Sequence, residues 1–395
     1  MMRWADGHRV KLCCVAVLFL LPIGCDLERS SESQPRSLCW EFERAVVRER
    51  VDAAGLLLQR KPNLIDCRDL RDWTPLHYAA SNGRVDMIHL LLARGAALLA
   101  TNNNGATPLH DAAYAGYPAA AEALLQAGAF VDAVDRFGNT PLQDAALEGN
   151  AAAADLLLRY HAAIEERSTR GYTPLNSAAS NGHADVVSLL LEHGANLESR
   201  DNNGFTPLQS AVWSDHPELA ALLLAAKADP NTRSDRGATP LHGAASKGSF
   251  ESAALLLEDG ALVNASDVHG FTPLHSAADK GQVDVAELLL ARGAHIDALT
   301  DARDTPLHWA ALNGRMDVAK MLVAKGAQIN AVDKDGNIPL HWAVVKGYVE
   351  MTEFLLAHGA DIKARSRFGC TPLRGALDDY QVSTALVLIR HGATL

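Results

Sequence analysis

Residues 235–267 read DRGATPLHGAASKGSFESAALLLEDGALVNASD, and this stretch decides the fold. Thr239 is suited to cap a helix because its hydroxyl can accept from a free backbone N–H, and Pro240 follows at a position that needs no donor. Gly248 can take the left-handed conformation that ends a helix. A second helix carries three consecutive leucines and ends at Gly260, after which the chain alternates and turns like a short hairpin. One unit therefore predicts helix, turn, helix and hairpin.

The unit recurs with a period of 33 residues. TPL stands with its threonine at 74, 107, 140, 173, 206, 239, 272, 305 and 371, and IPL stands at 338. One helix pair cannot bury its apolar side alone, whereas stacked copies bury a continuous core between neighbours. Residues 38–65 keep an alanine-containing helix and an LLL helix but lack the Thr-Pro start, so we expect an N-terminal capping repeat there. The sequence predicts eleven helix pairs.

The shared pattern consists of TPLH, an alanine pair, a helix-ending glycine, LLL, GA and a D-x-x-G turn before the next threonine. In this pattern residues 66–395 resemble ankyrin repeats. The resemblance implies an all-α ankyrin-repeat solenoid of helix-turn-helix units with short β-hairpins, about ten repeats plus the N-terminal capping hairpin at 38–65. It also implies that the hairpin tips and the exposed side of the first helices form a concave surface that binds a protein.

Several positions depart from the pattern. The residues that replace helix-ending glycines are His161, Asp215, Lys227 and Tyr380, while Arg303 and Ile338 alter other single positions. Three of the glycine replacements fall between residues 161 and 227. We therefore expect the middle of the stack to be its least regular part.

Charge and motifs limit the class of function. The chain has 36 basic and 47 acidic residues, and this net charge of −11 argues against nucleic acid as a partner, because phosphate backbones need clustered cations. The repeats contain no GxxxxGK[ST], HExxH or GxSxG motif and no Cys-x-x-Cys pair. We expect a non-enzymatic protein without a cofactor or metal site.

Two patterns resemble metal sites and have structural explanations. The histidines at the fourth position of TPLH are His77, His110, His242, His275, His308 and His341. Equivalent residues of stacked helices lie roughly 8 to 10 Å apart, too far to share one zinc ion, so we interpret them as partners of the capping threonine. VDKDGN at 332–337 lacks the full spacing of a calcium loop and falls on a hairpin turn.

Cysteines are few in the repeats. Cys39 and Cys67 both fall near the capping repeat, and their spacing alone leaves open whether they form a disulfide. Cys370 has no partner in its neighbouring repeats.

Aromatic and basic residues concentrate where the resemblance places the partner-binding surface. The aromatic candidates are Trp73, Tyr114, Phe137, Tyr172, Phe205, Trp213, Phe271 and Phe368, and the basic candidates are Arg71, Arg136, Arg170 and Arg236. Aromatic residues make up only 6% of the chain and often dominate interface energies, so their positions favour a protein partner. The alternative is that the tip aromatics pack on one another along the hairpins. Tyr78, Trp309 and Trp342 follow TPLH directly, and we expect them between adjacent repeats.

The N-terminal residues predict an export signal. Residues 1–11 carry three cations against one anion, and residues 12–23 are apolar, about twelve residues where a membrane-spanning helix needs ~20. LLPIGC resembles the lipobox of bacterial lipoproteins, with Pro22 at the place usually held by leucine, and the resemblance implies lipidation of Cys25. We expect a signal peptide at 1–24, a flexible tether at 25–37 and the repeat array at 66–395. A buried N-terminal helix or an upstream start misassignment in a cytosolic protein is the alternative.

Together these features predict a monomeric scaffold, tethered to an envelope membrane or secreted, that binds a protein partner. Two alternatives share the same fold: an exported effector that acts on host proteins, and a cytosolic ankyrin adaptor with an uncleaved N-terminus. An enzyme or enzyme subunit built on the repeats is a third, which the missing motifs disfavour.

Overall fold

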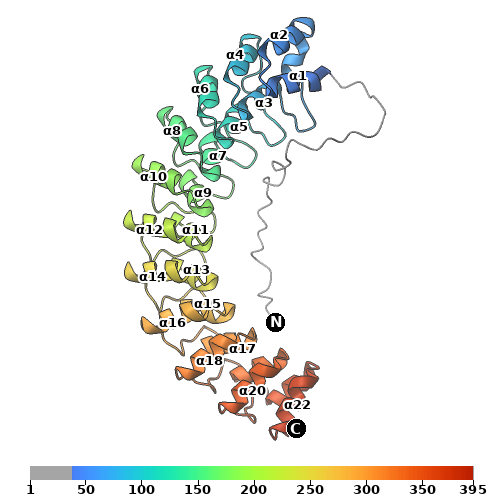
Figure 1. The fold of residues 1–395 in the computed structure, drawn as a ribbon. Coiled ribbons are helices and arrows are strands. Elements are labelled where there is room, and N and C mark those ends of the chain that lie inside the picture. The colour runs from blue at the N-terminus through green and yellow to red at the C-terminus, as the bar shows by residue number, and fades with distance from the viewer. Residues whose placement is uncertain (1–37, 395) are drawn as a thin grey trace, which may run out of the picture.

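The computed structural model describes residues 38–394 as a curved stack of eleven helix pairs, without strands in that range. The predicted all-α solenoid and its eleven pairs are therefore confirmed. The predicted signal peptide at 1–24, lipidated Cys25 and tether at 25–37 lie outside the described residues. The first helices of the pairs line the inner side of the arc in Figure 1. They are α1 (Leu38–Val47), α3 (Pro75–Ser81), α5 (Pro108–Tyr114), α7 (Pro141–Glu148), α9 (Pro174–Asn181), α11 (Pro207–Trp213), α13 (Pro240–Lys247), α15 (Pro273–Lys280), α17 (Pro306–Leu312), α19 (Pro339–Val345) and α21 (Pro372–Asp378).

The second helices form the outer layer of the arc. They are α2 (Val51–Arg60), α4 (Val85–Ala93), α6 (Pro118–Gln126), α8 (Ala151–Arg159), α10 (Ala184–Glu192), α12 (Pro217–Ala225), α14 (Phe250–Glu258), α16 (Val283–Ala291), α18 (Met316–Ala324), α20 (Val349–Ala357) and α22 (Val382–Arg390). A short 3-10 helix, η2 (Pro62–Asp66), connects the first pair to the second. Each helix packs on its partner, and each first helix packs on the first helix of the next pair. Contacts between successive second helices are fewer, and they are fewest between α18 and α20.

Paired side-chain and backbone hydrogen bonds start the first helices. In α7, Thr140 Oγ1 accepts from the backbone N–H of Gln143 at 3.3 Å, and Gln143 Oε1 accepts from the backbone N–H of Thr140 at 2.9 Å. The proline that follows each capping residue lacks only an N–H that would have no partner inside the helix. In the first helices from α3 to α17, a polar residue three positions after the capping threonine thus fixes where the helix begins.

Helix ends keep the left-handed backbone even where glycine is absent. The φ angles of His161, Asp215 and Lys227 are 62°, 63° and 76°, close to the 77° of Gly149. The irregularity that we expected in the middle of the stack therefore does not occur in the backbone at these positions. Non-glycine residues adopt this conformation at a cost of roughly 1 to 2 kcal/mol, which the neighbouring repeats must offset.

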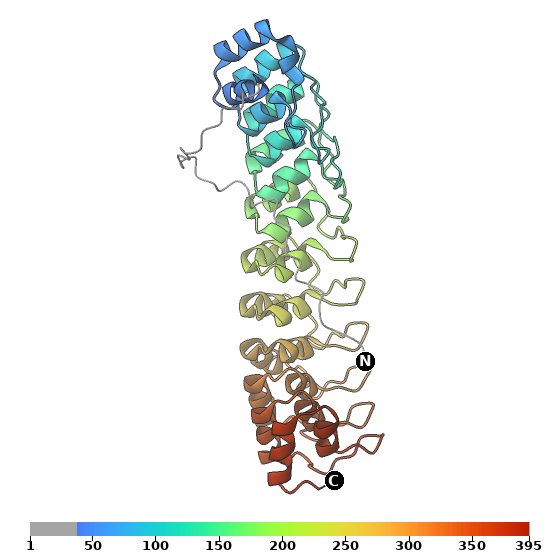
Figure 2. The same cartoon turned by 90° about the vertical axis from the view of Figure 1, so that its right-hand side faces the viewer.

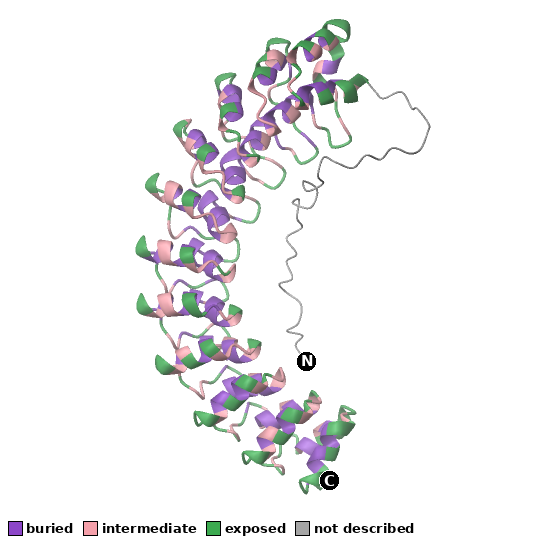
Figure 3. Ribbon diagram, in the orientation of Figure 1, coloured by how far each residue is buried: buried purple, intermediate pink, exposed green. Residues whose placement is uncertain are grey.

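The core consists of repeated leucine and alanine positions. The leucine after each helix-starting proline is buried, and so are the two alanines of the TPLH-x-A-A pattern wherever they occur, as with Leu241, Ala244 and Ala245. Small alanines allow adjacent first helices to approach closely. Buried residues run through both helix layers along the whole arc (Figure 3). Each repeat therefore completes the core of its neighbours.

The loops predicted as β-hairpins are tight turns stacked side by side, and they project to one side of the helices (Figure 2). Asp135 Oδ1 accepts from the backbone N–H groups of Phe137 and Asn139, both at 2.8 Å, which holds one loop in shape. The backbone N–H of Arg136 donates to the carbonyl of Asn104 in the preceding loop at 2.8 Å. Equivalent bonds join the other loops, so the tips form a continuous row.

The helices of residues 38–394 are short. None of them combines the length and the apolar character that crossing a bilayer requires.

Candidate protein-binding surface

The candidate site is the concave surface, which comprises the loop tips and the adjoining side of the first helices. In the repeat of α9 it consists of residues 169, 170, 172, 177 and 180, and the equivalent residues of the other repeats complete it. The stacked turns and the row of first helices hold these positions at regular intervals. Every predicted partner-binding residue occupies one of them.

The predicted aromatic residues remain accessible on this surface. Phe137 and Phe368, at two loop tips, are 52% and 70% exposed. The other six, Trp73, Tyr114, Tyr172, Phe205, Trp213 and Phe271, are half-buried. The structure thus places all eight along one face without burying any of them fully.

Several of these aromatics also contact other rings, as the alternative interpretation expects. The ring centroids of Phe205 and Trp213 lie 5.8 Å apart in an edge-to-face arrangement. Phe271 contacts Trp309 of the next repeat in the same geometry at 4.7 Å. Such pairs fix the orientation of the rings while leaving one side of each accessible, which limits the entropy lost on binding.

The residues that follow TPLH differ from one another in their contacts. Trp309 lies between repeats as we expected, since it contacts Phe271. Tyr78 and Trp342 donate hydrogen bonds to the loop aspartates of their own repeats, Tyr78 to Asp69 Oδ2 at 2.8 Å and Trp342 to Asp333 Oδ2 at 3.3 Å. The hydroxyl of Tyr78 and the indole N–H of Trp342 thus have acceptors within their own repeats, which the sequence spacing did not indicate.

The four predicted arginines, Arg71, Arg136, Arg170 and Arg236, are exposed at the loop tips. The Arg71 guanidinium lies 5.0 Å from the ring centroid of Trp73 and 3.4 Å from Asp69 Oδ2. Arg367 has a similar arrangement over Phe368 at 4.6 Å. Exposed ion pairs stabilise little, so these cations stay available to a partner.

The histidines of TPLH have structural partners at both ring nitrogens. His77 Nδ1 accepts from the backbone N–H of Thr74 at 3.2 Å, and His77 Nε2 donates to the carbonyl of Ala106 in the next repeat at 3.1 Å. Burial lowers the pKa of His77 and His275 to about 4. These neutral imidazoles tie one repeat to the next.

Two aspartates on the concave surface, the buried Asp144 and the half-buried Asp111, were not predicted from the sequence. Asp111 and Asp144 follow TPLH and TPLQ in adjacent repeats, where other repeats carry Ser177 or Ser210. Asp144 is only 8% exposed, and Asp111 Oδ2 is buried without a hydrogen-bond partner. Burial raises the pKa of both carboxyls well above its usual range. No sequence signal singled them out, because the equivalent position varies among the other repeats and also holds Trp309 and Trp342.

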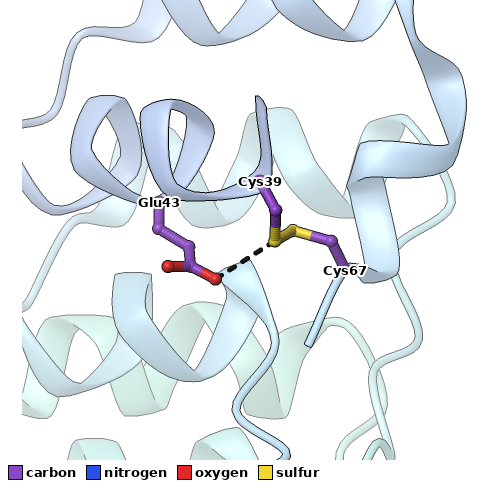
Figure 4. Close-up of side chains that lie close together, drawn as sticks. All are labelled: Cys39, Glu43 and Cys67. Carbon is purple, nitrogen blue, oxygen red and sulfur yellow. Dashed lines mark hydrogen bonds between the residues drawn. A yellow bond between two sulfur atoms is a disulfide. The ribbon is translucent and has the colours of Figure 1, made fainter. Parts of the chain in front are cut away.

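Cys39 in α1 and Cys67 after η2 form a disulfide, with their Cα atoms 6.1 Å apart (Figure 4). Glu43 Oε1 lies 3.2 Å from Cys39 Sγ. These three residues are the one group of histidine, cysteine and acidic side chains in residues 38–394 whose ligand atoms cluster within 4.8 Å. Metal binding needs thiolates, so the disulfide form offers no sulfur ligands. The bond joins the capping pair to the array.

Comparisons with known proteins agree with this geometry. The 2-5A-dependent ribonuclease of Mus musculus is 41% identical to this chain over 64 residues, which are 16% of this chain and 9% of the ribonuclease. So short a match carries no argument about catalysis. A family model described as ankyrin repeats (3 copies) matches residues 42–135, 100–168, 142–234, 226–300 and 297–366. Because these matches together cover most of the sequence, the chain belongs to the ankyrin-repeat family.

Proposed function

We propose that this protein is a non-enzymatic scaffold that binds a protein partner on its concave surface while tethered to an envelope membrane. The observation that carries the binding role is the row of accessible aromatic side chains from Trp73 to Phe368 along one face. Ankyrin repeats generally mediate protein binding and are generally non-catalytic, which supports the same role. Aromatic anchors flanked by arginines are the residue types that contribute most to interface affinity.

Buried polar groups support the same surface. The side-chain atoms buried without a hydrogen-bond partner in residues 38–394 are Asp111 Oδ2, Trp213 Nε1 and Trp309 Nε1. All three belong to first helices, on the side that carries the candidate residues. Unsatisfied groups cost stability, and a surface that tolerates several is more typical of a binding face than of packing alone.

A crosslinking experiment tests the concave surface. A photoreactive phenylalanine analogue at Phe205 should capture a partner in the native envelope fraction, and the Tyr172→Ala/Phe205→Ala double variant should bind that partner at least ten-fold more weakly. Phe250, which is 51% exposed on α14 of the outer layer, provides the control position. Equal capture from Phe250, or unchanged affinity of the double variant, would contradict the assignment.

Export and tethering rest on the sequence of residues 1–25, with the Cys39–Cys67 disulfide as support. Disulfides persist in oxidising compartments and are rare in the cytosol. The mass of the N-terminal peptide from the native membrane fraction decides the point. An acylated Cys25 as first residue is expected, whereas an unmodified chain beginning at Met1 or Met2 would favour the cytosolic adaptor.

A further inference from the structure

An acidic cluster lies on and beside the concave surface of the second and third pairs from the capping pair. It consists of Asp111 in α5, Asp144 and Glu148 in α7, and Asp135 in the loop before α7. The packed helices α5 and α7 bring these carboxyls near enough that the charges of Asp135, Asp111 and Glu148 add to burial in raising the pKa of Asp144. Tyr114, at the end of α5, lies beside Asp144 and Glu148, whose charges help raise its pKa to about 12.

The cluster contains one buried carboxyl oxygen that nothing in residues 38–394 satisfies. Asp144 is 8% exposed and its carboxyl makes no hydrogen bond, and Asp111 Oδ2 is buried without a partner. The cation that acts on Asp111 is Arg71, but Arg71 makes its ion pair with Asp69 and leaves Asp111 Oδ2 without a partner. A buried carboxyl without a cation or donors either holds a proton or awaits a partner.

The spacing of the carboxyls favours an arginine guanidinium over a metal ion. No three of them bring one oxygen each within 4.8 Å of one another, because the only such group in residues 38–394 is Cys39, Glu43 and Cys67. A metal ion needs its ligand atoms closer together. A planar guanidinium has five N–H donors that can reach separated carboxylates, and it stacks on aromatic rings such as Tyr114.

We propose that the acidic cluster of Asp111, Asp135, Asp144 and Glu148 receives an arginine side chain of the protein partner. This inference rests on the proposed function, because the arginine arrives on a segment bound along the concave surface. The aromatic residues of the concave surface anchor the partner segment, and the acidic cluster selects for its positive charge. Small neutral residues hold the equivalent position in α9 and α11, so the cluster marks one place along the surface where a cation is required.

Selection of random twelve-residue peptides against the immobilised full-length protein tests the proposal. Enriched peptides should share an arginine, and replacing that arginine by citrulline, its neutral isostere, should weaken binding at least ten-fold. The Asp111→Asn/Asp144→Asn variant should lose the same factor. Asp284→Asn, at an exposed position of α16 in the outer layer, should bind these peptides as the unaltered protein does.

The outcomes separate this inference from the proposed function. Peptides that depend on Tyr172 and Phe205 but bind equally to the Asp111→Asn/Asp144→Asn variant would overturn the arginine site and leave the binding surface intact. Failure to enrich any peptide that depends on the concave surface would overturn both.

Thermal unfolding guards against a folding artefact. Because the carboxyls lack partners in the free protein, the Asp111→Asn/Asp144→Asn variant should melt at a higher temperature than the unaltered protein at pH 7, even though it binds the peptides more weakly. A lower melting temperature would show that the carboxyls stabilise the fold, and it would overturn the proposal.

Discussion

The indole of Trp213 lies directly against Gly243 of the next repeat. A Cβ atom placed on Gly243 would come within 2.7 Å of Trp213 Nε1 and 2.9 Å of Trp213 Cδ1. The backbone of Gly243 is helical, so the glycine is required there by the neighbouring ring rather than by its own conformation. The position of an anchor residue in one repeat is thus set by the absence of a side chain in the next.

We predict that Gly243→Ala lowers the free energy of unfolding by about 1 to 3 kcal/mol, because the added methyl group displaces the indole. Gly375→Ala is the matched control, since Gly375 holds the same place in α21 and its Cβ would meet only Val345 Cγ2, at 3.3 Å. Its stability should stay the same or rise by up to about 1 kcal/mol, because alanine favours helix. Denaturant titration with tryptophan fluorescence measures both. Equal effects of the two substitutions would contradict the contact.

We predict that acid destabilises the protein through the buried histidines. The folded pKa of His77 and His275 is about 4, below the ordinary 6.5, so the unfolded chain binds more protons between these values. Their stabilising contribution is therefore complete above about pH 6.5 and is lost as the pH falls toward 4. Urea midpoints measured from pH 7 to 4 should fall along this window.

Glutamine substitution isolates this effect. In α11, Gln209 Oε1 accepts from the backbone N–H of Thr206 at 3.1 Å and Gln209 Nε2 donates to the carbonyl of Ala238 at 2.8 Å, so glutamine replaces both histidine bonds. The urea midpoint of the His77→Gln/His275→Gln variant should change less with pH than that of the unaltered protein. The midpoint of His89→Gln, on the exposed side of α4, should follow that of the unaltered protein. Parallel pH curves for all three would disprove the histidine contribution.

We predict that losing the Cys39–Cys67 disulfide loosens the capping pair. The bond closes a loop with a sequence separation of 28, for which the chain-entropy estimate is about 3 to 4 kcal/mol. Cys39→Ser/Cys67→Ser should speed amide hydrogen exchange in α1 and α2 and leave α12 to α16 unchanged, because each repeat contacts only its neighbours. Cys370→Ser, at a half-buried free cysteine, is the control. If α1 and α2 exchange at the same rate in Cys39→Ser/Cys67→Ser as in the unaltered protein, the bond has no role in the stability of the capping pair.

We predict that Lys227→Gly stabilises the protein by about 0.5 to 1 kcal/mol. Lys227 has a φ of 76°, and relief of this strain exceeds the entropy that glycine adds to the unfolded chain. Gly260→Lys is the reciprocal test. Gly260 holds the same place in the next repeat, just after α14, where φ is 88° and a Cβ would meet nothing within 4 Å. It should destabilise by a similar amount, as judged from thermal melting. Destabilisation by Lys227→Gly, or stabilisation by Gly260→Lys, would rule out backbone strain as the cause.

The sequence predicted the fold well because the information for each unit is local and repeated. Thr239, Pro240 and Gly248 predict where a helix begins and ends. In the structure, α13 begins at Pro240 and ends at Lys247, just before the glycine. The candidate aromatics were found by the same register. Whether they contact a partner stays a prediction.

Features that depend on contacts between units were not predictable. The burial of Asp144 depends on how α5 and α7 pack, and the pattern TPLQD gives no sign of it. The meeting of Cys39 with Cys67 depends on η2, which lies outside the 33-residue pattern and turns the chain back toward α1. The left-handed backbone at Lys227 likewise comes from its neighbours, because lysine alone does not favour it.

The single backbone bond that joins each loop to the next has the same form at every junction, as in Arg136 to Asn104 and Asn202 to Arg170. A gene duplication or deletion of one whole unit would therefore recreate the junction that it interrupts. Such an event would move the acidic cluster relative to Tyr172 and Phe205 by one step and leave the chain foldable. Unequal recombination can thus change which partner segments fit, without any point mutation in the anchors themselves.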